Sequence, residues 1–274
     1  MKIAIYSPPG NIFSTCLGIS LRAEGHRVLP RDPRHWRGEI EECDLMIIKS
    51  ARRIELIRAY EAAGVPVFIF DWGYIKRVNT PREHQQGHWQ ISHSRLNQFP
   101  DFDVPSDRLE KLAIEISRKS YANNKRALLI GQMPGDGAVK GTCHATWLRE
   151  RQMELQADGF DVVYREHPRG GVKMPHLPSA DGDLLEEMRA SRVVVTYSSN
   201  TGHDALRAGV PVLCDPIAPY AELAGMTLPS LPKRRAYFQR LAYGQWRVDE
   251  TGPAVQFILS EWLPRIKACR PHKT

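Results

Sequence analysis

Short apolar segments alternate with helical segments in two successive runs along this chain of 274 residues. The first run contains four expected strands at 2–6, 26–29, 45–48 and 65–70, and two expected helices at 11–24 and 52–63. Strands that alternate with helices of about ten to fifteen residues form βαβ units, in which the strands lie parallel and helices cover the sheet. The pattern therefore predicts an α/β protein with doubly wound sheets.

The alternation stops in a polar, aromatic stretch from 71 to 105 and resumes at 127, with a bridging helix expected at 106–119. The second run contains expected strands at 127–130, 161–164, 192–196 and 211–214, and expected helices at 142–158, 182–190, 202–208 and 253–266. We expect two Rossmann-like domains that face a crevice, at residues 1–120 and 121–250. A C-terminal helix within 251–274 is expected to pack back on the first domain.

Composition narrows the class of protein. The chain is 42% hydrophobic and 25% charged, as in ordinary globular proteins, and it contains no apolar run long enough to span a membrane. The N-terminus lacks the apolar core of a signal peptide, so a cytoplasmic location is expected. Five cysteines without a CxxC pair argue against a disulfide framework or a zinc site. The net charge of +7 suits nucleic acid, an anionic lipid surface or a nucleotide, or solubility alone.

The segment from 193 to 206 is typical of a buried strand, a hydroxyl-rich turn and a helix start. Backbone N–H groups, the helix dipole and the hydroxyl groups together suit a phosphate. The turn residues are Ser198, Ser199, Asn200, Thr201 and Gly202, and Asp204 in the first helical turn is within reach of a ribose hydroxyl. The alternative is that Ser199, Asn200 or Thr201 only caps the helix.

Two further turns follow expected strands, and in open α/β folds ligands bind at this edge of the sheet. His167 is a candidate for donating to a phosphate or carrying a proton, or it is an ordinary loop residue beside Pro168. Arg165 or Arg169 is a candidate for neutralising phosphate charge. Gln132 and Asp136 lie in a Gly-rich turn that matches neither the Walker loop nor the dinucleotide fingerprint. They are candidates for sugar or base contacts, although Asp136 also suits a helix cap.

The fourth candidate segment is FDWGY, at the end of the expected strand 65–70. Asp71 would face the crevice there and could serve as a general base, or as an ordinary turn-capping carboxylate. Trp72, Tyr74 and Trp89 give the stretch after it the aromatic content of an ordered surface.

Together these segments resemble GT-B-like glycosyltransferases. GQMPGDGAV, YREHPRGG and VVVTYSSNTGHDALRAGVPVLCD are similar to the donor-binding half, most of all in capsule-polysaccharide Kdo transferases and small phage-encoded relatives. With FDWGY, HWQISHSRLN and RLAYGQW, the resemblance covers about residues 65 to 250. Two features depart from the family: Arg165-Glu166 stands where capsule enzymes tend to have Lys-Pro, and the chain is short, so its acceptor domain is reduced.

The resemblance implies that His167, Ser198, Ser199, Asn200 and Thr201 hold the phosphates of a nucleotide-sugar. It implies that Asp204 meets the ribose, and that Gln132 and Asp136 lie near the sugar. We expect a UDP-linked donor and no other cofactor, and since no DxD pair follows a strand, we expect no metal.

The expected reaction is a direct displacement with inversion at the anomeric carbon, with Asp71 as the base and Asp136 as the alternative catalytic carboxylate. The basic charge, the phage-like relatives and the rings of Trp72, Tyr74 and Trp89 favour hydroxymethylated pyrimidines in double-stranded DNA as acceptor. A polysaccharide or lipid acceptor and a non-catalytic nucleotide- or DNA-binding module are the alternatives. The sequence leaves open the identity of the sugar and the nucleotide, the stereochemistry and the oligomeric state.

Overall fold

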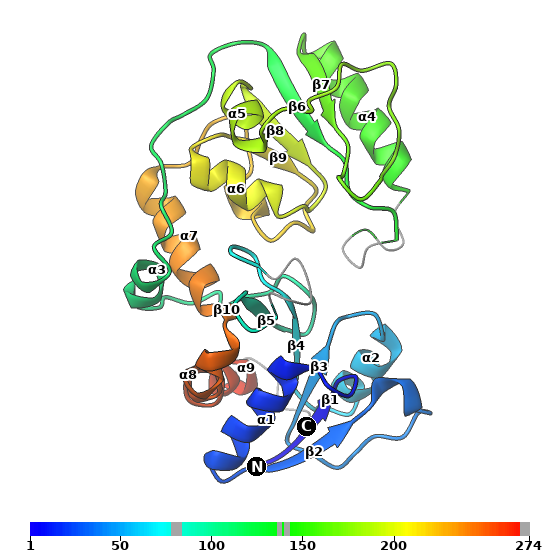
Figure 1. The fold of residues 1–274 in the computed structure, drawn as a ribbon, viewed down its shortest axis with the longest axis vertical. Helices are drawn as coiled ribbons and strands as arrows, with labels where there is room; N and C mark the ends of the chain where they lie inside the picture. The colour runs from blue at the N-terminus through cyan, green and yellow to red at the C-terminus, as the bar shows by residue number, and fades with distance from the viewer. Residues whose placement is uncertain (78–83, 136–138, 140–142, 269–274) are drawn as a thin grey trace. The chain divides into compact units, whose positions relative to one another are not determined.

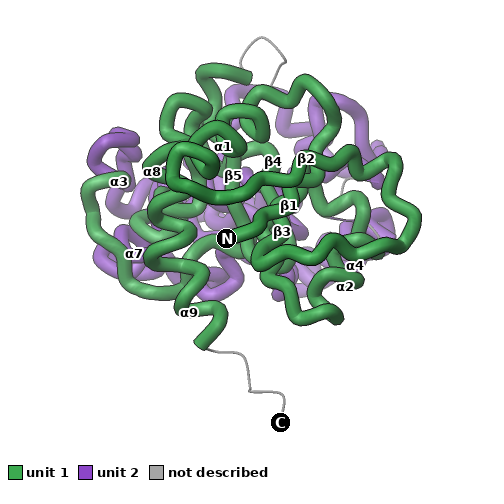
Figure 2. Tube along the Cα trace, turned by 90° about the horizontal axis from the view of Figure 1, so that it is seen from below, with its two compact units in different colours: residues 1–108, 239–274 green, residues 109–238 purple. Residues whose placement is uncertain are grey.

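A computed structural model describes residues 1–77, 84–135, 139 and 143–268. The chain divides into two compact units, coloured separately in Figure 2: residues 1–108 with 239–274 form unit 1, and residues 109–238 form unit 2. Both units are built from a helix-covered sheet, which confirms the predicted α/β class. The first boundary between the units lies after residue 108, whereas the sequence places it after residue 120. The chain returns to unit 1 at residue 239, before the C-terminal helix expected within 251–274.

Unit 1 contains a six-stranded sheet in the order β10-β5-β4-β3-β1-β2 (Figure 1). Its strands are β1 (Lys2–Tyr6), β2 (Arg27–Arg31), β3 (Leu45–Lys49), β4 (Val67–Trp72), β5 (Trp89–His93) and β10 (Gln245–Trp246). Its helices are α1 (Ile12–Ala23), α2 (Ile54–Ala62), α8 (Thr251–Phe257) and α9 (Leu263–Ala268), with a π-helical turn at Ile258–Trp262. The strands β2, β1, β3 and β4 are parallel, β5 pairs antiparallel with β4, and β10 pairs antiparallel with β5.

Local sequence explains where these elements begin and what they bury. The side chain of Asn11 caps α1 by accepting a hydrogen bond from the N–H of Ser14 at 2.9 Å. The helix then buries Phe13 and Leu17 in the same core as the C-terminal residues Phe257 and Trp262. Helices α1 and α8 pack side by side (Figure 1). The C-terminal segment is therefore part of the core of unit 1.

The stretch from 71 to 105, expected to be a loop, contains strand β5. This strand pairs with β4 from Phe68↔His93 to Trp72↔Trp89. The sequence does not predict this strand, because Gln90 and Ser92 interrupt its apolar pattern. Both side chains are buried and hydrogen-bonded to each other at 2.8 Å. The expected helix at 106–119 is also wrong in extent: only α3 (Asp107–Lys111) forms.

Unit 2 contains a parallel four-stranded sheet in the order β7-β6-β8-β9. Its strands are β6 (Arg126–Ile130), β7 (Asp161–Arg165), β8 (Val193–Thr196) and β9 (Val212–Cys214). Its main helices are α4 (His144–Ala157), α5 (Leu184–Arg189) and α6 (Thr201–Ala208). These follow the sequence expectation closely. Helix α7 (Leu231–Tyr243), which the sequence analysis missed, carries the boundary between the units. Within the described part of the chain, no helix has the length and apolar character needed to cross a membrane.

Candidate functional site

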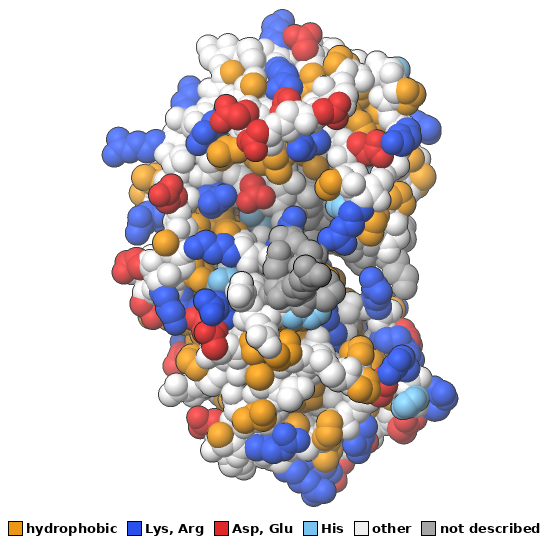
Figure 3. All heavy atoms as spheres, in the orientation of Figure 1, with side chains coloured by type: hydrophobic (Ala, Val, Ile, Leu, Met, Phe, Trp, Pro, Cys, Tyr) orange, Lys and Arg blue, Asp and Glu red, His pale blue; other side chains and the backbone are white. Residues whose placement is uncertain are grey.

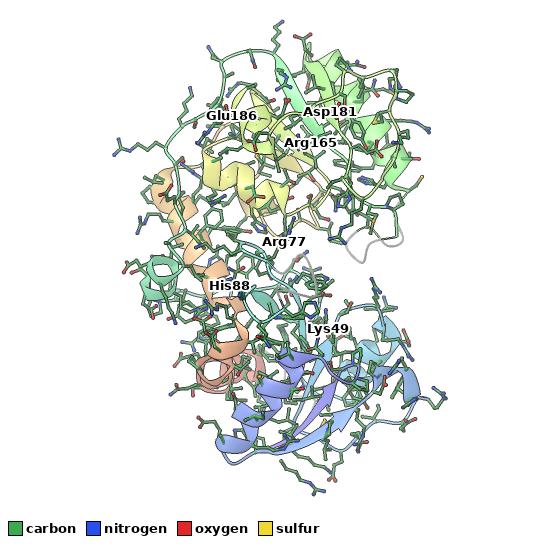
Figure 4. All side chains as sticks on the ribbon, viewed as in Figure 1. Lys49, Arg77, His88, Arg165, Asp181 and Glu186 are labelled. Carbon is green, nitrogen blue, oxygen red and sulfur yellow. The ribbon has the colours of Figure 1, made fainter. Side chains whose placement is uncertain are left out.

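Three segments singled out in the sequence lie at one edge of the unit 2 sheet. Strands β7, β6 and β8 are neighbours and run parallel, so their carboxyl ends meet at that edge. Gln132 follows β6, His167 follows β7 and Ser198 follows β8; Figure 4 labels Arg165, the last residue of β7. In open α/β sheets this edge is where ligands bind.

The side chain of Gln132 connects the ends of β6 and β8. Its Oε1 accepts a hydrogen bond from the N–H of Ser198 at 2.8 Å, and its Nε2 donates to Ser198 Oγ at 3.4 Å. Its backbone N–H donates to Nε2 of His144 at 3.0 Å. Both Gln132 and Ser198 are 5% exposed. The amide, expected near a sugar, thus holds the hydroxyl-rich turn in place.

The turn itself engages several of its own N–H groups. The N–H of Ser199 donates to Thr196 Oγ1, and that of Thr201 to Ser199 Oγ, both at 3.3 Å. Asn200 occupies the N-cap position of α6, yet its side chain makes no capping hydrogen bond. The side chain of Asn200 therefore does not cap the start of α6. The hydroxyl groups of the turn and the helix dipole together suit an anion.

Buried aromatic residues support this turn from inside unit 2. The Tyr220 hydroxyl donates to the carbonyl of Ser199 at 2.6 Å. The ring of Tyr220 lies so close to Gly202 that a Cβ there would be 2.1 Å from Cζ. His203, fully buried, contacts Asn200 Oδ1 at 3.3 Å and the Tyr237 hydroxyl at 2.8 Å. The sequence analysis missed these supports, because Tyr220 and Tyr237 lie far along the chain from the turn.

His167 presents one ring nitrogen to the protein backbone. Its Nδ1 accepts the N–H of Arg169 at 3.2 Å, so the ring proton of the neutral form is on Nε2, which can donate to an anion. Arg165, expected to neutralise phosphate, donates through Nη1 to the carbonyls of Ala180 and Gly182 at 2.8 and 2.6 Å. Arg165 therefore anchors the segment after β7, and its contact with a donor stays a prediction.

Of the two aspartates expected near the donor, the structure describes only Asp204. Asp204 is partly exposed in the first turn of α6 and lies 3.8 Å from Arg207 of the same helix. It stays a candidate for a ribose contact. Asp136 lies outside the described residues. Across those residues, no group of three or more His, Cys, Asp or Glu side chains is placed to hold a metal ion.

In unit 1, Asp71 near the end of β4 forms an ion pair with Lys49 at the end of β3, labelled in Figure 4. Lys49 Nζ donates to Asp71 Oδ1 at 2.7 Å, and both side chains are largely buried. The same Oδ1 accepts the N–H of Trp72 at 2.8 Å. Asp71 is thus a fixed carboxylate near the carboxyl ends of the parallel strands of its sheet. Lys49 escaped the sequence analysis because a lysine at the end of a strand carries no motif.

Of the three aromatic residues expected to contact an acceptor, only Trp72 is exposed, at 40%. Trp89 is fully buried and stacks on Trp72 with ring centroids 5.5 Å apart. Tyr74 is buried, and its backbone N–H donates to Gln245 Oε1 at 3.0 Å. The expectation that all three form an aromatic surface is wrong, because Tyr74 and Trp89 belong to the core of unit 1.

The surface charge is mixed. On the face drawn in Figure 3, the Lys and Arg side chains of the described residues are interspersed with Asp and Glu. That face shows no continuous basic surface among the residues it draws in colour. The net charge of +7 is therefore compatible with solubility alone.

The fold of this chain is similar to those of solved glycosyltransferase structures. The chain matches the KpsC β-Kdo 2,4-transferase of Thermosulfurimonas dismutans with a TM-score of 0.59 and 15% identity, over 90% of this chain and 92% of that one. It matches the β-Kdo 2,7-transferase of the same KpsC with a TM-score of 0.54 and 14% identity, over 93% and 98%. No family model matches the sequence, and no curated protein matches it. The resemblance to Kdo transferases is thus confirmed in the fold.

Proposed function

We propose that this protein is a GT-B-type glycosyltransferase, which moves a sugar from a nucleotide-sugar to a hydroxyl group of a polysaccharide. The observation that carries the proposal is the turn at 198–202, which Gln132 ties to the neighbouring strand at the ligand-binding edge of unit 2. It occurs in a chain whose fold is that of two Kdo transferases.

Unit 2 would bind the donor. As the sugar leaves, negative charge grows on the phosphate oxygens, and donors fixed in advance stabilise it without reorganisation. The hydroxyl groups of Ser198 and Thr201, the start of α6 and Nε2–H of His167 are donors of this kind. Asp204 would accept a hydrogen bond from the ribose.

Unit 1 would activate the acceptor through Asp71. The acceptor oxygen attacks the anomeric carbon while its proton passes to the carboxylate. The bond between the anomeric carbon and the phosphate oxygen breaks, and its electron pair leaves with the nucleotide. The exposed ring of Trp72, beside this carboxylate, suits the apolar face of a sugar.

We favour a polysaccharide hydroxyl over hydroxymethylated DNA. The two solved structures compared above are Kdo transferases. In addition, the burial of Tyr74 and Trp89 removes two of the three rings on which a flipped base would stack.

The test is an incubation of the protein with a panel of CMP-, UDP- and GDP-linked sugars, Kdo among the sugars, and two sets of acceptors. One set contains acidic and neutral oligosaccharides, and the other contains DNA with hydroxymethylated pyrimidines. Mass spectrometry should detect one added sugar on an oligosaccharide, and the gain should disappear in His167→Ala. A gain on DNA alone would overturn the polysaccharide acceptor. Nucleotide binding by calorimetry without transfer to either set would overturn the enzyme itself.

A further inference from the structure

Lys49 occupies a position where a cation is costly unless it is compensated. Its side chain is 15% exposed and that of Asp71 is 12% exposed. The ammonium group lies 5.2 Å from the ring centroids of Trp72 and Trp89 and 6.0 Å from that of Phe70. Burial of an ammonium ion costs several kcal/mol, which a carboxylate and aromatic faces offset.

We propose that Lys49 is a positioning residue that fixes the carboxylate of Asp71 for proton transfer. This inference rests on the proposed function, in which Asp71 takes the proton of the acceptor hydroxyl. It adds a second residue, from a different strand, on which the orientation of the base depends.

The hydrogen bonds of Asp71 are divided unequally between its two oxygens. Oδ1 accepts from Lys49 Nζ at 2.7 Å and from the N–H of Trp72 at 2.8 Å. Of all the residues that the structure describes, none donates to Oδ2. Two donors on one oxygen fix the plane of the carboxylate and leave the other oxygen available to a substrate hydroxyl.

The surroundings of Lys49 limit where its ammonium can go. Lys49 pairs with Phe70 in the parallel register of β3 and β4, so its stem runs beside the strand that carries Asp71. Trp72 and Trp89 are cross-strand partners in β4 and β5, stacked at an interplanar angle of 17°. Their rings hold the ammonium within reach of Asp71. Trp72 and Trp89 therefore determine how the base is held.

The test is a double-mutant cycle on the full chain, with the sugar donor and acceptor that the wild-type protein uses. Lys49→Met removes the charge and the donor, Asp71→Asn removes the base, and a third protein carries both changes. Lys49→Arg keeps a cation that can donate. Lys2→Met is the matched control, because Lys2 also forms an ion pair, with Glu42 at 3.3 Å, but Glu42 is 97% exposed.

We expect Lys49→Met to lower kcat about 100-fold, the scale of effect for a misplaced catalytic group, with the dissociation constant of the nucleotide donor unchanged. The same change in the Asp71→Asn background should have almost no further effect, because Lys49 acts only through Asp71. Lys49→Arg should recover part of the rate, and Lys2→Met should keep all of it. If Lys49→Met does not fold, Lys49→Gln takes its place, since it keeps a hydrogen-bond donor without the charge.

An equal loss in the wild-type and Asp71→Asn backgrounds would overturn the positioning role, and so would full activity of Lys49→Met. Full activity of Asp71→Asn would overturn both the base and its positioning residue while glycosyl transfer itself stands. A wild-type protein that transfers no sugar overturns the proposed function before any variant is compared.

Discussion

Gln132 and Ser198, 66 residues apart in the chain, are joined by two hydrogen bonds, from the N–H of Ser198 to the side-chain oxygen of Gln132 and from the side-chain nitrogen of Gln132 to Ser198 Oγ. The Gly-rich turn after β6 and the hydroxyl-rich turn after β8 therefore form one structure. A substitution that moves one turn should therefore also move the other, because the side-chain amide of Gln132 connects them.

Replacement of Gln132 by Ala should weaken both stability and donor binding. The buried N–H of Ser198 loses its partner, which costs about 1 to 3 kcal/mol in the free energy of unfolding. The freed turn should also bind the nucleotide at least tenfold more weakly. Urea denaturation and calorimetric titration measure the two effects. Gln156→Ala on the exposed side of α4 is the control, and binding of the nucleotide by Gln132→Ala at wild-type affinity would show that the amide does not organise the turn.

Replacement of Gly202 by Ala should disturb the same turn through its contact with Tyr220. The new Cβ would lie 2.1 Å from Cζ of the buried Tyr220, so either the ring or the start of α6 must move. Overpacking of this kind costs about 1 to 3 kcal/mol. Gly252, in helix α8, has nothing within 4 Å of its Cβ position. Gly252→Ala should therefore be neutral or slightly stabilising. Equal unfolding free energies for the two variants would contradict the role assigned to Tyr220.

The sequence predicts the parallel part of both sheets because most of those strands contain a short apolar run. It could not reveal β5, in which buried Gln90 and Ser92 satisfy each other and remove the apolar pattern. It predicts that a C-terminal helix within 251–274 packs on the first domain, but not that the chain returns to unit 1 as early as residue 239, since that depends on side chains that meet only in the folded chain.

The candidate site shows the same limit. Strand ends followed by polar turns predict where Gln132, His167 and Ser198 lie, because parallel strands present their carboxyl ends at one edge. Which atoms bond to one another depends on distant partners, such as Tyr220 beneath Ser199. Lys49 could not be chosen over other lysines from the sequence, because its burial beside Asp71 appears only in three dimensions.

Arg108 should prove essential to the stability of unit 1. It is 5% exposed, its guanidinium donates to the carbonyls of Ala242 and Gln245, and it pairs with Glu250 at 3.2 Å. It therefore ties the end of the first segment of unit 1 to the segment that returns. Arg108→Met would remove the buried cation that pairs with Glu250, with an expected loss of about 3 to 5 kcal/mol.

Urea denaturation would measure this loss, and Arg247→Met is the control. Arg247 pairs with the exposed Asp249 at 2.9 Å, and pairs of this kind contribute about 0 to 1 kcal/mol. A loss for Arg108→Met as small as that of the control would mean that the return of the chain does not depend on this arginine.

Acid should destabilise unit 2 through His144. Burial lowers the pKa of this histidine from 6.5, and its Nε2 accepts the N–H of Gln132 at 3.0 Å, which requires an unprotonated nitrogen. Between the lowered pKa of the folded protein and 6.5, the unfolded chain binds more protons than the folded one. The free energy of unfolding should therefore be fully present above pH 6.5 and decrease as the pH falls below it, by up to about 1.4 kcal/mol per pH unit for one histidine.

Urea denaturation at pH 7.5, 6.5 and 5.5 measures this slope in the wild-type protein and in His144→Gln. The variant should be less stable at pH 7.5 and should depend less on pH. Some dependence should persist, because burial also lowers the pKa of His88 in unit 1. His35→Gln, at an exposed position, should leave the slope unchanged. An equal slope in His144→Gln and wild type would show that this ring binds protons equally in the folded and the unfolded chain, and would contradict the pH dependence assigned to its hydrogen bond with Gln132.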